Sequence, residues 1–191
     1  MKASTLLRTA RAARGVSQRE LSKAAHVSQP GIAAVESGSH DTTVGRLELL
    51  LTALGQRMTV LPTRTRPVWE AAVALRQALD EGNESTAWRE IIQLADDLAR
   101  EDGATRVALT VTRPLLVGDT RYDALLAAVT DLRLSQDRLP RPAWLDASAY
   151  RLDPPWDVEV IPALQSKARR QTPRAVARHG VFLRAAELAS M

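Results

Sequence analysis

The chain has 191 residues, 26 Lys and Arg against 22 Asp and Glu, and no cysteine. The lack of cysteine excludes disulfides, thiolate zinc sites and thiol redox chemistry, and we expect a reducing cytoplasm. No apolar run approaches the length that a bilayer requires and the N-terminus lacks a secretory signal, so no membrane partner is expected. The net charge of +4 lies in residues 1–62, where it favours modest attraction to phosphate.

A helix is predicted to begin directly after Ser17. Ser17 and Glu20 are three residues apart in front of the apolar residue Leu21, which is the pattern of a capping box. The helix would run to Ala25, where the chain is expected to turn.

A second helix is predicted from Ser28 to Ser37. Ser28 can cap it, and Pro30 fits its first turn because the amides there lack intrahelical partners anyway. Ile32 and Val35 lie three residues apart on one face, which we expect to be buried. The opposite face would then be free to enter a DNA major groove.

Residues 5–55 resemble a lambda-repressor-like helix-turn-helix bundle of the Cro/C1-type (XRE) family of DNA-binding repressors. The resemblance implies one more helix near Thr5–Arg14 and another at Thr43–Leu54, ended by Gly55. This chain has His26 in the turn, where the family usually has glycine. His is enriched among non-glycine residues at positive φ, so the turn remains feasible and His26 is assigned a structural role.

The resemblance also implies which side chains meet DNA. Gln18 would bind backbone phosphate, and the amide of Gln29 would read a base edge, for example adenine N6 and N7. The residues beside Gln29 lack side-chain donors, so direct readout should be sparse and two half-sites at a fixed separation should add specificity. The expected DNA-binding residues are Gln18, Arg19, Ser28, Gln29, Pro30, Gly31, Ala33, Ala34, Ser39, His40, Thr42 and Thr43.

Residues 56–62 follow the last helix of this head. Met58 and Val60 alternate with polar residues, as in a half-buried strand. A lone strand needs a partner, and antitoxin-type members of the resembled family pair it with the same strand of a second subunit. We therefore predict a homodimer with Met58 and Val60 at its interface, while an extended linker remains the alternative. The expected organisation is a DNA-binding domain at residues 1–62, a linker at 63–68 and a helical domain at 69–191.

Beyond residue 68, apolar residues recur at helical spacing. They predict helices at residues 69–79, 84–101 and 119–134, of which the last two read as amphipathic. Residues 105–117 fit helix and strand almost equally and are assigned a helix. A proline-rich stretch at residues 139–162 is expected to form an ordered loop anchored by Trp144 and Trp156.

The final segment, residues 163–191, is basic, and Thr172 and Pro173 should begin a short helix that ends at His179 and Gly180. Its charge could close over the acidic helix of its own domain, contact DNA beside the operator, or bind an acidic partner. Contact within its own domain is the first expectation.

The sequence contains no His pair at ligand spacing, no phosphate-cradling glycine loop and no nucleophile motif. We therefore expect no catalytic residue, no metal, no cofactor and no enzyme activity. The proline-rich loop and the C-terminal segment resemble parts of helix-turn-helix antitoxins that are paired with AbiEii-type nucleotidyltransferase toxins. The predicted function is that of an antitoxin and autorepressor, a homodimer that binds a double-stranded DNA operator and a cognate toxin protein.

Two alternatives stay open. The second domain could bind a small molecule near its tryptophans and make the protein a one-component regulator. The head could also be a helical bundle whose groove-facing surface serves protein contact.

Overall fold

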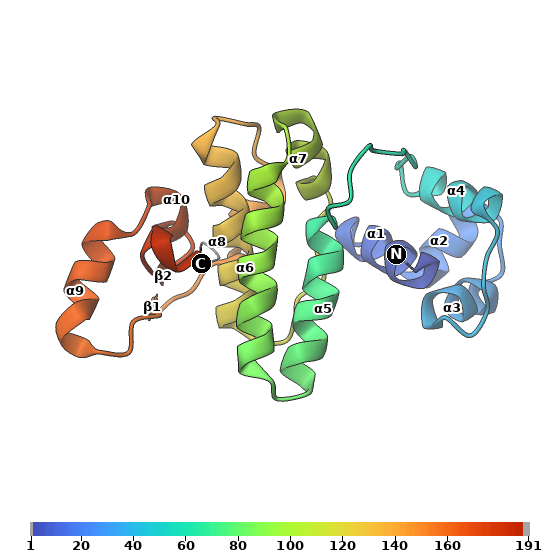
Figure 1. Ribbon diagram of the computed structural model, residues 1–191. Coiled ribbons are helices and arrows are strands. Elements are labelled where there is room, and N and C mark those ends of the chain that lie inside the picture. The colour runs from blue at the N-terminus through green and yellow to red at the C-terminus, as the bar shows by residue number, and fades with distance from the viewer. Residues whose placement is uncertain (1, 189–191) are drawn as a thin grey trace. The chain divides into compact units, whose positions relative to one another are not determined.

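The computed structural model describes residues 2–188 (Figure 1). These residues form ten α-helices, three short 3-10 helices and one two-stranded parallel sheet, which confirms the predicted mostly helical class. The chain divides into two compact units. The first comprises the described residues through Pro62 together with Thr112–Leu115, and the second comprises Thr63–Val111 and the described residues from Leu116 onward. Within residues 2–188, no helix is both long enough and apolar enough to cross a membrane.

Four helices build the first unit, and their bounds are α1 (Ala3–Ala13), α2 (Gln18–Ala25), α3 (Gln29–Ser37) and α4 (Val44–Ala53). The predicted capping box closes, because Glu20 N donates to Ser17 Oγ at 3.2 Å and Ser17 N donates to Glu20 Oε2 at 2.7 Å. His26 has φ 54°, so it ends α2 in the left-handed region as expected.

Each of the four helices contributes one large aliphatic side chain to the core of the first unit. Leu7, Leu21, Ile32 and Leu50 are all inaccessible to solvent. Burial of such a side chain stabilises the folded state by about 1.5–3 kcal/mol. The predicted inward face of α3 is therefore confirmed, and it holds the rest of that helix at the surface.

Residues 56–62 form no strand in this single chain. Met58 packs, partly buried, against the core of its own head, whereas Val60 is 94% exposed. A strand shared between two subunits needs a second copy, so the homodimer stays a prediction.

The second unit begins with four helices, α5 (Val68–Asp80), α6 (Glu84–Arg100), α7 (Gly103–Thr110) and α8 (Thr120–Gln136). It continues with η1 (Ala143–Asp146), η2 (Ser148–Tyr150), β1 (Trp156–Asp157), α9 (Pro162–Gln171), α10 (Arg174–Ala177), β2 (Val181–Phe182) and η3 (Ala185–Leu188). In this unit α6 packs between α5 and α8, as Figure 1 shows, and β1 pairs with β2.

The prediction that α8 is amphipathic was wrong. Residues 122–132 are all buried, because α6 and α7 pack on this helix together with η2, α10 and β2. Small side chains at Ala124, Ala127 and Ala128 let these neighbours approach closely. As a consequence, α8 buries two carboxylates, Asp123 and Asp131, which must find partners inside the protein.

The C-terminal part departs from prediction in two ways. Trp144 anchors the proline-rich stretch as expected, since its Nε1 donates to the Thr110 carbonyl at 2.9 Å, but helix α9 was not foreseen. The basic segment does contact its own unit. Within the described residues η3 packs on α6, the acidic helix, as expected. The ion pairs of the segment, however, join Arg178 to Asp131, Arg169 to Asp157 and Arg184 to Glu187, and His179 forms a hydrogen bond with Asp131. None of these described pairs reaches an acid between residues 80 and 102.

Candidate DNA-binding site

Helix α3 offers an exposed N-terminal turn to solvent. Ser28 caps it by accepting a hydrogen bond from Gly31 N at 3.3 Å, and Gln29 and Pro30 are exposed in the same turn. Ala33 and Ala34 are half-buried, so they can contribute only small apolar contacts. The N-terminal turn of α3 is therefore open to solvent, and Gln29 is the one residue of α3 with a long polar side chain that is exposed.

A row of hydrogen bonds connects Gln29 to the interior of the head. Gln29 Nε2 donates to Gln18 Oε1 at 3.1 Å, and Gln18 Nε2 donates to Glu36 Oε2 at 2.9 Å. Glu36 also accepts from Arg11 Nε at 2.6 Å and from Arg11 Nη2 at 2.8 Å. Each amide in the row points its nitrogen inward, which leaves Gln29 Oε1 without a hydrogen-bond partner among the described residues.

The Arg11–Glu36 pair is the fixed end of this row. Only 3% of the Glu36 side chain and 17% of the Arg11 side chain are exposed. Burial raises the pKa of Glu36, but the hydrogen bonds from Arg11 and Gln18 and the Arg11 charge outweigh it, so the pKa lies below its usual value. An ionised, fully hydrogen-bonded carboxylate holds Gln18, and through it Gln29, in one orientation.

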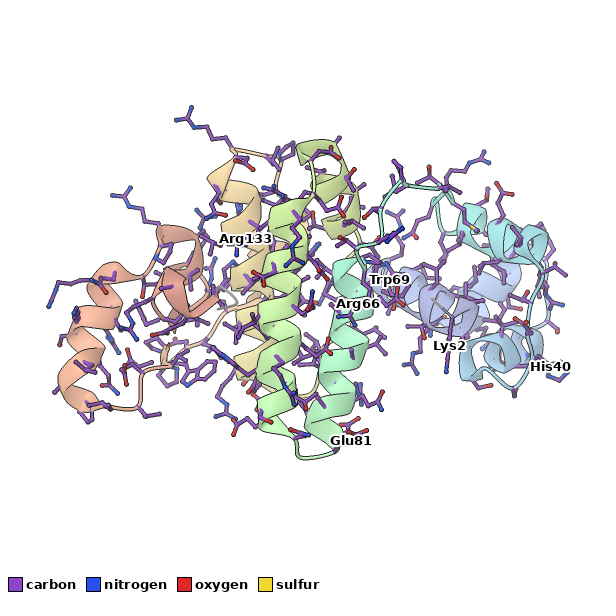
Figure 2. All side chains as sticks on the ribbon, viewed as in Figure 1. Lys2, His40, Arg66, Trp69, Glu81 and Arg133 are labelled. Atoms are coloured by element: carbon purple, nitrogen blue, oxygen red, sulfur yellow. The ribbon has the colours of Figure 1, made fainter. Side chains whose placement is uncertain are left out.

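The loop after α3 supplies fewer free donors than predicted. Ser39 Oγ and His40 N both donate to the Ala34 carbonyl, at 3.1 and 3.2 Å, so these two donors end α3 and are not free for phosphate. The His40 side chain is exposed on this loop, as Figure 2 shows. Thr43 Oγ1 caps α4 by accepting from Arg46 N at 3.2 Å, which leaves its own hydroxyl hydrogen available.

Thr42 and Arg19 complete the predicted set. The Thr42 Oγ1 atom is buried and has no partner in the described part of the chain. Arg19 is exposed in the first turn of α2, next to Gln18. The structure therefore places the residues of α2 and α3 on one connected surface, with the loop residues beside it.

Arg46 is a further basic residue of this surface, which the predicted set did not include. It lines a small depression of about 240 Å³ together with Gly31, Ala34, His40 and other residues. A Cβ atom on Gly31 would lie 2.9 Å from Arg46 Nη2, so the glycine lets the guanidinium lie against α3. Arg46 is exposed and forms no ion pair with another described residue. The sequence offered one indication of this role, namely that Arg46 follows the helix cap Thr43 by three residues.

Comparison with known families agrees with this geometry. A helix-turn-helix family model matches residues 7–61, which are nearly the whole first unit. Neither the curated proteins nor the solved structures gave a match. The match and the exposed face of α3 define the head as a helix-turn-helix domain of the DNA-binding, regulatory kind. Among residues 2–188 no group of three or more His, Asp or Glu side chains could hold a metal ion.

Proposed function

We propose that this protein is a transcriptional repressor that reads a double-stranded operator through the N-terminal turn of α3. The observation that carries the proposal is the hydrogen-bonded row from the buried Arg11–Glu36 pair through Gln18 to Gln29. A pre-oriented side chain loses less conformational entropy on binding than a free one, so it discriminates better between bases.

The chemistry of Gln29 favours adenine. Its free Oε1 can accept from adenine N6, while the second hydrogen on Nε2 can donate to N7. Arg46 and the first turn of α2 flank this position with a guanidinium and with backbone amides, both of which suit phosphate. Base contact and backbone contact would thus come from neighbouring parts of one surface.

Two subunits would read two half-sites. Val60 is 94% exposed and Leu49 is 50% exposed, which leaves apolar surface on the head that a second copy could cover. We infer a homodimer joined through residues 56–62.

The finer proposal is an antitoxin that also represses its own operon in the cytoplasm. Two features support this proposal. The second unit is large and its sequence contains no catalytic motif, and its C-terminal segment resembles antitoxins of the AbiEii-type systems. Such a unit would bind and neutralise a toxin encoded by the adjacent gene.

Fluorescence anisotropy of the full-length chain with a duplex from upstream of its own gene tests the repressor proposal. Tighter binding to this duplex than to a scrambled duplex of the same composition, at one salt concentration, is the expected result. Equal affinity for both would reject sequence-specific repression.

Co-expression with the neighbouring gene product tests the antitoxin role, which fails if the two proteins do not co-purify and growth is not protected.

A one-component regulator is the second candidate. It is favoured by a single observation, an aromatic groove in the second unit that lies within the size range of small-molecule sites.

A further inference from the structure

The aromatic groove lies where the first turns of α6 and α8 meet β1. Its volume is about 490 Å³, against roughly 300–1,000 Å³ for typical small-molecule sites. Its walls are formed by Trp88 of α6, Tyr122 of α8 and Trp156 of β1, extended by Val158 and Val160. The Tyr122 and Trp156 rings are tilted by 49° with their centres 6.2 Å apart, so they form two sides of the groove and do not stack face to face.

Tyr122 forms a mostly buried wall of the groove. It is 2% exposed and lies beside the Trp156 ring. Burial raises the pKa of Tyr122, and the Glu84 charge raises it further, so the hydroxyl stays neutral and can donate a hydrogen bond at neutral pH.

The charge that remains free at the groove is negative. Arg121 is already used, because its Nη2 lies 2.9 Å from Asp119 Oδ2 and its guanidinium lies 5.5 Å from the centre of the Trp156 ring. Glu84 lines the groove, is exposed, and makes no ion pair with another described residue. The side chains of Asn83 and Asp119 cap the two helices here, so their first amides are partly satisfied.

We propose that this groove binds a small organic cation whose apolar body contacts Trp88, Tyr122 and Trp156 and whose charge pairs with Glu84. Aromatic faces attract cations through their quadrupole, and an adjacent carboxylate adds direct attraction. The inference concerns the second unit alone and holds whether or not the head binds DNA, so its test can fail independently of the repressor proposal.

Three matched probes test the proposal by calorimetric titration of the full-length chain. Benzyltrimethylammonium is the cation, benzyl alcohol the neutral analogue and benzenesulfonate the anion. We expect saturable one-site binding of the cation, about tenfold tighter than binding of either analogue, with a change in tryptophan fluorescence. The Glu84→Gln variant should lose about threefold to fivefold in affinity for the cation while its affinity for benzyl alcohol stays the same. The Trp88→Leu variant should bind both the cation and benzyl alcohol more weakly than the parent does.

Glu81→Gln is the matched control, since Glu81 is an exposed acid at the α5–α6 turn that bonds to Gln77 and does not line the groove (Figure 2). Its affinity for the cation should equal that of the parent. Thermal unfolding verifies that each variant is folded, and Glu84→Gln decides the question if Trp88→Leu does not fold. Absence of saturable cation binding, equal affinity for the three probes, or an unchanged Glu84→Gln variant would each overturn the proposal.

Discussion

Gln18 connects the interior of the head to its surface, because one end of its amide contacts the buried Glu36 and the other contacts Gln29. The capping box predicted where Gln18 lies, and the spacing of Ile32 and Val35 predicted that Gln29 faces outward. The contact of Gln18 with Glu36, 18 residues away, could not be predicted, because local periodicity contains no information about which side chains meet across helices.

Loss of the Glu36 carboxylate should destabilise the head. Glu36→Ala leaves the Arg11 guanidinium partly buried without its partner, which costs about 3 kcal/mol in similar pairs. Urea unfolding followed by helical circular dichroism would measure this. Tryptophan fluorescence should not change its midpoint, because all four tryptophans lie in the second unit.

Glu48→Ala provides the control for that measurement, since the Glu48–Arg57 pair is exposed and spans 3.7 Å. It should cost less than about 1 kcal/mol. Equal losses for the two variants would show that the buried pair is not what holds the head together.

Among the elements, α8 carries two buried carboxylates with opposite shifts in pKa. Burial raises the pKa of Asp131, but hydrogen bonds from His179 and Arg141 outweigh it and lower the pKa to about 2. Burial also raises the pKa of Asp123, and since the Val117 amide is its one hydrogen-bond partner among the described residues, its pKa rises to about 6. The two residues should therefore affect stability in different pH ranges.

Asp131→Asn should destabilise the second unit most at neutral pH. The folded pKa of Asp131 lies below its unfolded value of about 4, so its contribution is present above pH 4 and is lost as the pH falls toward 2. The difference in unfolding free energy between parent and variant should shrink by on the order of 2 kcal/mol from pH 5 to pH 2, as measured by tryptophan fluorescence in urea. Asp146→Asn, which removes an exposed partner of Arg141, should show no such pH dependence. A pH-independent difference for Asp131→Asn would contradict the assigned role.

Asp123→Asn should show the reverse trend. The folded pKa of about 6 lies above the unfolded value of about 4, so the carboxyl contributes stability below pH 4 and loses it as the pH rises through 6. Asn keeps an oxygen for the Val117 amide, which donates at 2.8 Å to Asp123. Relative to the parent, the variant should gain on the order of 2 kcal/mol between pH 4 and pH 7.5 in the same fluorescence assay. If the variant gains no stability relative to the parent over this range, the pKa of Asp123 is not raised in the folded state.

The elements also show what sequence patterns can and cannot predict. Helix α8 was predicted from its cap Asp119 and its apolar spacing, but its burial on all sides depends on α10 and β2, which come more than 30 residues later. Helix α9 was missed because most of its side chains are exposed, so no apolar stripe announces it. Arg46 was missed for a related reason, since its approach to Gly31 depends on the tertiary arrangement of the head and not on local spacing.

For the whole molecule, the central structural proposal is a dimer joined through residues 56–62. Val60→Asp places a charge on a side chain that is 94% exposed in the single chain, so it should leave the fold intact and convert the dimer into a monomer. Sedimentation velocity at micromolar concentration would measure the mass. Val160→Asp, which changes another valine that is 84% exposed, should leave the dimer unchanged. A Val60→Asp variant that remains dimeric would place the interface elsewhere. A parent protein that is monomeric would contradict the dimer itself.

Base discrimination by Gln29 tests most directly whether α3 reads the operator. The Kd values of the parent and of Gln29→Ala would be measured for the upstream duplex and for a scrambled duplex at one fixed salt concentration, with Gln77→Ala as a control for an exposed glutamine in the second unit. We predict that Gln29→Ala loses about tenfold in affinity for the upstream duplex, with little change on the scrambled duplex, because one bidentate base contact discriminates by roughly 1–3 kcal/mol. Equal losses on the two duplexes, or no loss on either, would contradict the role of α3 as the reading helix.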